Sequence, residues 1–167
     1  MKDFYSDLWL LKNDFIKFEI PLKEIELIKK RVIKDLELSD AFKLNDKAEG
    51  IEYFERSILK ACPFLFFKKY TKINTQNTQS EKSFEAECIL IENQLYNIAV
   101  INFGEMPITR NLDCKLNTLL FIKRDRRVYY FAGIIDKKAI KNSEINFSEL
   151  NFKNDLNTNT SEFTRML

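Results

Sequence analysis

Apolar residues in the first third of the chain recur three and four positions apart, as they do on one face of a helix. This spacing predicts a first helix over residues 3–18 and a second helix that begins near Pro21. The apolar stripe of the second helix comprises Leu22, Ile25, Ile28, Val32 and Leu36. A third helix is predicted over residues 47–61. Pro63 is expected to end it, because proline lacks the backbone donor that a helix interior needs.

Beyond this proline the pattern changes, and from Phe84 apolar residues follow the two-residue period of a β-strand. Residues 64–73 are predicted to be extended. Two hairpins are predicted after them, the first joining 84–91 to 94–103 and the second joining 115–123 to 127–135. The short segment 136–142 is predicted to be helical.

The register of the first hairpin follows from a two-residue turn at Glu92-Asn93. This turn pairs Ile89 with Tyr96 across the two strands. The strand face that carries Leu90 and Ala99 is the more apolar of the two. We therefore expect that face to meet the helices.

These elements predict an α+β protein with N-terminal helices packed on a mainly antiparallel sheet of four to five strands. The 167 residues are enough for one domain, which we place at residues 1–140. Residues 141–167 form a polar, Asn-rich C-terminal tail in this interpretation.

Composition excludes several kinds of chemistry. The chain has no His, which removes Ser-His-Asp and Cys-His catalysis and His-based zinc hydrolysis. Its three Gly cannot assemble a phosphate-binding loop, so no nucleotide cofactor is expected. The three Cys include no CxxC pair that would indicate a zinc site. No apolar run is long enough to span a membrane and no signal peptide is evident, so a cytoplasmic protein is predicted.

Two acidic residues, Glu85 and Glu87, stand two positions apart on the first predicted strand and therefore project from the same side. With a third acid they would suit Mg²⁺, which prefers carboxylate oxygens. The alternative is that both lie at the solvated margin of the sheet.

The order of helix AEGIEYFERSI, strand FEAECILI and hairpin TLLFIKRDRRVYYFAGIIDKKAI resembles the restriction-endonuclease-like, PD-(D/E)XK, nucleases. The resemblance implies a first catalytic acid at Glu87 or Glu85. It implies an acid-x-lysine triplet at Ala99-Val100-Ile101, where no residue can bind a metal. The active-site motif is thus degenerate, unless Glu105 or Glu55 supplies a displaced carboxylate.

Four cations, Lys123, Arg124, Arg126 and Arg127, surround the turn of the second hairpin. They would suit contacts to nucleic-acid phosphates, or they form a solubilising turn that protects the end of the sheet. The run Lys29-Lys30-Arg31 on the second helix could also contact phosphates, or it forms a solvated helix face. The net charge of +2 is too small to indicate nucleic-acid binding by itself.

The leading hypothesis is a non-catalytic binding or accessory protein whose sheet and basic hairpin contact a protein or a nucleic acid. This protein would need no cofactor. The competing hypothesis is a metal-dependent nuclease that uses Glu85 and Glu87 as ligands of Mg²⁺.

Overall fold

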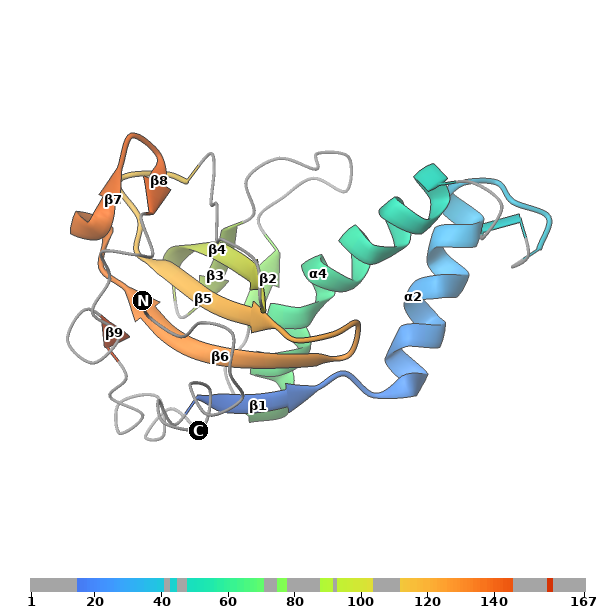
Figure 1. Ribbon diagram of the computed structural model, residues 1–167, viewed down its shortest axis with the longest axis horizontal. Helices are drawn as coiled ribbons and strands as arrows, with labels where there is room; N and C mark the ends of the chain where they lie inside the picture. The colour runs from blue at the N-terminus through green and yellow to red at the C-terminus, as the bar shows by residue number, and fades with distance from the viewer. Residues whose placement is uncertain are drawn as a thin grey trace.

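The computed structural model describes residues 15–40, 43–44, 48–70, 75–77, 88–91, 93–103, 112–145 and 156–157. Two α-helices and one large mixed sheet dominate this part of the chain (Figure 1). The helices are α2 (Leu22–Asp35) and α4 (Ala48–Tyr70). The strands of the large sheet are β1 (Ile16–Glu19), β2 (Thr75–Asn77), β3 (Cys88–Ile91), β4 (Gln94–Asn102), β5 (Thr118–Lys123), β6 (Val128–Ile135) and β9 (Leu156–Asn157).

The large sheet has the order β1-β6-β5-β4-β3-β2, and β9 also pairs with β6. Five strands of four to nine residues form its body, and the short β2 and β9 extend it. The predicted α+β class is confirmed. The sheet is mixed, however, because β4 and β5 run parallel while the other neighbours are antiparallel.

The N-terminal end of the described chain corrects the first prediction. Residues 16–18 were predicted to be helical, but Ile16–Glu19 is a strand that pairs with β6. Phe18 is buried while its neighbours Lys17 and Glu19 are exposed, which is the alternation of a strand. Pairing with β6, which is distant in sequence, therefore determines that this segment is a strand and not a helix. The rest of the predicted first helix lies outside the described residues.

Helix α2 lies where it was predicted, but one residue of its predicted apolar stripe, Leu22, is 61% exposed. The helix begins directly after Pro21, whose fixed φ suits a helix start, and it buries Ile25 and Val32. Figure 1 shows α2 beside the first half of α4, so that the two helices pack on each other.

Helix α4 is longer than predicted, because it passes through Pro63 and ends at Tyr70. The predicted end at residue 61 and the predicted strand from residue 64 are therefore wrong. Phe54, Ile58, Cys62 and Phe66 lie four residues apart and are all buried. A proline inside a helix costs about 3 kcal/mol, and burial of Phe66 and its neighbour Phe67 offsets that cost.

Both predicted hairpins are present among the described residues. β3 and β4 pair in the predicted register, with Ile89 opposite Tyr96. β5 and β6 form the second hairpin, and their register shifts beside Leu120. Gly133 lies opposite Leu120 with a φ of 125°, a conformation that favours glycine.

Side chains cover both faces of the sheet. One face meets α2 and α4 through a core that includes Phe18, Phe66, Ile98, Phe121 and Phe131. The opposite face carries a second buried cluster: Ala99, Ile101, Leu112, Leu120, Ile122, Tyr130, Ala132, Ile135, Ile140 and Ile145. The helices therefore cover the face of Ile89 and Ile98 rather than the face of Ala99, which corrects the predicted orientation.

Beyond β6, a short 3-10 helix, η1 (Lys137–Ala139), agrees with the helical prediction for this segment. It leads into a separate two-stranded pair, β7 (Ile140–Lys141) and β8 (Glu144–Ile145). Ile145 is buried in the second cluster, and β9 joins the main sheet through β6. Parts of the segment 141–167 therefore contribute to the packed structure.

Candidate functional site

The predicted site residues divide into two groups. Glu85, Glu87 and Glu105 lie outside the described residues. The four cations of the second hairpin are described, and all of them lie at or beside the turn between β5 and β6. Ala99, Val100 and Ile101, where the family resemblance places its second motif, form the middle of β4.

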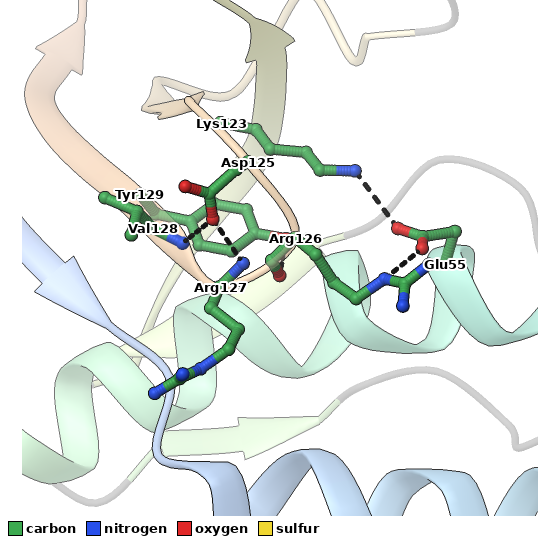
Figure 2. A network of polar contacts seen from close by, with 7 residues as sticks. All are labelled: Glu55, Lys123, Asp125, Arg126, Arg127, Val128 and Tyr129. Atoms are coloured by element: carbon green, nitrogen blue, oxygen red, sulfur yellow. Dashed lines mark hydrogen bonds and ion pairs between the residues drawn. The ribbon is translucent and has the colours of Figure 1, made fainter.

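Asp125 closes the turn of the second hairpin through its own side chain (Figure 2). Its Oδ1 accepts hydrogen bonds from the backbone N–H groups of Arg127, at 2.9 Å, and Val128, at 3.0 Å. The N–H of Arg124 donates to the carbonyl of Val128 at 2.9 Å. An Asp side chain commonly forms such local bonds in turns, so the tip has a defined shape.

Glu55 of α4 holds two of the hairpin cations (Figure 2). Lys123 Nζ lies 3.2 Å from Glu55 Oε2, and Arg126 Nε lies 2.6 Å from Oε1. Each oxygen of the carboxylate therefore has its own cationic partner. The side chains of Lys123 and Glu55 are only 18% and 26% exposed, so this contact is partly shielded from water.

Arg127 fastens the opposite side of the turn to the segment between β1 and α2. Its Nη2 lies 2.7 Å from Glu19 Oε1, and its Nε donates to the carbonyl of Ile20 at 3.2 Å. The N–H of Ile20 donates in return to the carbonyl of Arg127 at 2.9 Å. The hairpin tip is therefore attached to α4 on one side and to the start of α2 on the other.

Two aromatic side chains, Phe54 and Tyr129, contact Arg126 of the turn. The Arg126 guanidinium lies 5.6 Å from the centre of the Phe54 ring, a distance suited to a cation–π contact. Tyr129 is fully buried beneath the turn, and its hydroxyl donates to the carbonyl of Arg126 at 3.5 Å. Burial raises the pKa of Tyr129, and the nearby Cys62, Glu55 and Asp125 raise it further. Tyr129 therefore stays protonated.

Two cysteine thiols are also held in the protonated form. Burial raises the pKa of Cys62. Burial raises the pKa of Cys88, and the negative charge of Asp113 raises it further. Since the thiolate is the nucleophile, neither environment activates a cysteine.

The buried side-chain amide of Asn97, near the start of β4, holds the segment that precedes β5. Asn97 is 1% exposed, and its Nδ2 donates to the carbonyls of Asp113, at 2.9 Å, and Leu116, at 3.2 Å. Its Oδ1 accepts from the N–H of Asp113 at 3.1 Å. These bonds fasten the segment before β5 to β4, which is a structural role.

Among the residues that the structure describes, no three His, Cys, Asp or Glu side chains gather closely enough to hold a metal ion. The pairing of Glu55 with Lys123 is a contact that the sequence did not reveal. The two residues are 68 positions apart, and no spacing rule links a helix to a distant hairpin.

No protein-family model, curated protein or solved structure matches this chain. In the described segments, no helix is both long enough and apolar enough to cross a membrane.

Proposed function

We propose that this chain is a non-catalytic binding protein that contacts a protein or nucleic-acid partner through its basic hairpin tip, Lys123–Arg127. The observation that carries this proposal is the anchoring of the tip. Glu55, Glu19 and Asp125 hold it from three directions. A contact surface that is already ordered loses little conformational entropy when it binds.

The four cations have different roles in this proposal. Lys123 and Arg127 are the more enclosed pair and act mainly as anchors. Arg124 is exposed, and the Arg126 side chain is 56% exposed. Arg126 uses only its Nε to reach Glu55, and a guanidinium has further N–H donors. These donors suit a partner's carboxylate or phosphate, which planar guanidinium groups bind in pairs of hydrogen bonds.

The test is a binding titration with three labelled probes: a short DNA duplex, a DNA single strand and a poly-glutamate peptide. We expect salt-sensitive binding to at least one probe, weakened about threefold to tenfold by Arg124→Gln combined with Arg126→Gln. The matched control is Arg56→Gln combined with Lys138→Gln, which removes two positive charges at exposed residues outside the tip. Equal affinities for the double variant and the unmodified chain would refute a role for the tip.

A second candidate function is the metal-dependent nuclease that the family resemblance implies. The observation that favours it is the 3.2 Å contact between Glu55 and Lys123, which brings together a carboxylate and an amine. Nucleases of this kind use both groups. Arg126 occupies the other oxygen of Glu55, however, and this competes with a metal.

Incubation of the protein with plasmid DNA and Mg²⁺ or Mn²⁺ separates the two candidates. Cleavage that disappears in Glu87→Ala, and with a chelator, would replace the non-catalytic proposal with the nuclease. Intact plasmid under all of these conditions supports the non-catalytic proposal.

A further inference from the structure

The outward face of α2 carries positive charges. Within the described structure, carboxylates pair with cations of the hairpin, but not with those of this face. Lys23, Lys30, Arg31 and Lys34 are exposed, and with Leu27 they fall within a stripe about 100° wide when positions are counted around the helix. We call these five residues the α2 face. The buried residues of the helix, Ile25 and Val32, lie on the other side.

None of the four cations of the α2 face forms an ion pair with a carboxylate in the described part of the chain. Glu26 and Lys30 have the spacing for such a pair and do not form one. Asp35, near the end of the helix, instead interacts with the Tyr53 hydroxyl of α4. The α2 face therefore keeps its positive charge, whereas Glu55 and Glu19 offset much of the charge at the hairpin tip.

Leu27 lies at the centre of the α2 face and is 50% exposed. An apolar residue ringed by charged residues is the usual arrangement of a protein–protein contact, in which the centre loses water and the rim stays polar. A phosphate backbone, by contrast, offers only polar contacts to the rim and none that suits a leucine.

We infer that the α2 face docks on an acidic protein helix that presents a leucine among its carboxylates. This inference rests on the proposed function only in taking the chain to be a non-catalytic binding protein, and it adds a contact surface separate from the hairpin tip together with a partner chemistry. Charge complementarity selects an acidic partner, and Leu27 selects a protein rather than a nucleic acid. The stripe from Lys23 to Lys34 spans about 16 Å, which matches three turns of a partner helix.

The experiment uses the full chain and a synthetic helical peptide with glutamates flanking a central leucine. A second peptide replaces that leucine with serine and keeps the charge, and a DNA duplex is the third probe. Fluorescence anisotropy should show that the leucine peptide binds more tightly than the serine peptide. We expect Lys30→Glu with Arg31→Glu to weaken this binding about tenfold or more. Leu27→Ser should remove the preference for the leucine peptide.

Lys137→Glu with Lys138→Glu is the matched control, because it makes the same change of charge on the exposed residues of η1. This control should bind the leucine peptide as the unmodified chain does. Equal losses in the two double variants would overturn the inference, since a general charge effect would then explain both. Tighter binding to the DNA duplex than to either peptide, lost with Lys30→Glu and Arg31→Glu, would also overturn it.

The hairpin variants separate this inference from the proposed function. If Arg124→Gln with Arg126→Gln abolishes binding to every probe and the α2 variants do not, the hairpin proposal stands and the α2 inference fails. If only the α2 variants lose binding, the α2 inference stands without the hairpin. Circular dichroism of each variant establishes that a loss reflects contact rather than unfolding.

Discussion

Phe66 is the centre of the core between α4 and the sheet, and its replacement by alanine tests how that core is built. Its ring is 1% exposed and meets four other rings, those of Phe18, Phe67, Phe121 and Phe131, at centroid distances from 4.9 to 5.8 Å. Three of these contacts are edge-on, the geometry that the charge distribution of aromatic rings favours. The mutation Phe66→Ala therefore removes contacts to both helix and sheet residues.

The expected cost follows from burial. Truncation of a fully buried Phe to Ala costs about 3–5 kcal/mol, which includes the cavity left behind. Phe64 of the same helix is only partly buried. We expect Phe64→Ala to cost about 1–2 kcal/mol, because it returns less apolar area to water.

The free energies of unfolding can be measured by urea titration followed by far-UV circular dichroism. The comparison also distinguishes a helix from a strand, since a strand would place Phe64 and Phe66 on the same face. Equal costs for the two alanine variants would refute the helical register of α4 beyond Pro63. If Phe66→Ala fails to fold, Phe66→Leu and Phe64→Leu replace the two alanine variants; the change should cost about 1–2 kcal/mol at the buried Phe66 and less at the partly buried Phe64.

Three further predictions concern the hairpin anchor, the buried amide and the effect of pH. Glu55→Gln should lower the free energy of unfolding by about 1 kcal/mol, because solvent screening limits the strength of its ion pairs. Glu52→Gln, which removes a more exposed ion pair, should lower it by less than about 0.5 kcal/mol. Equal costs would contradict the role of Glu55 as an anchor of the hairpin. Asn97→Ala should cost about 2–3 kcal/mol in urea unfolding, because the backbone groups of the segment before β5 lose their partner, and a neutral result would contradict that role. The raised pKa values of Cys62 and Tyr129 mean that the unfolded chain loses these protons first, so stability falls by up to ~1.4 kcal/mol per pH unit above the pKa of each unfolded group, which is about 8.5 for a cysteine and about 10 for a tyrosine. Unfolding measured from pH 7 to 11 should show that fall, and Cys62→Ala should lessen its first part, to which Cys88 also contributes. An unchanged profile in this variant would contradict the assignment.

Features set by neighbours in sequence could be predicted. The stripe of α2, the register of β3 with β4 and the pairing of β5 with β6 all follow from short-range spacing and tight turns. The same reasoning located the basic turn at the tip of the second hairpin. Each of these features needs only residues that are close together along the chain.

Features set by distant partners could not be predicted. The apolar residues up to Phe18 fit a helical spacing, but pairing with the distant β6 makes Ile16–Glu19 a strand. The rule that proline ends a helix failed at Pro63, because a buried stripe continues on both sides of it. At the candidate site, the cations were identified, but their carboxylate partners on α4 and β1 were not. The sequence around a charged side chain does not indicate which distant residue will form an ion pair with it.

The pairing of β1 with β6 has a consequence for how the protein is made. Glu19 and Arg127 are 108 residues apart, so β1 leaves the ribosome long before the strand beside it exists. At typical rates of synthesis this delay is roughly 5–20 s. During that interval Phe18 and Ile20, both buried in the finished protein, have no sheet to cover them. The nascent chain is therefore expected to engage chaperones at its N-terminal strand until β6 has been synthesised.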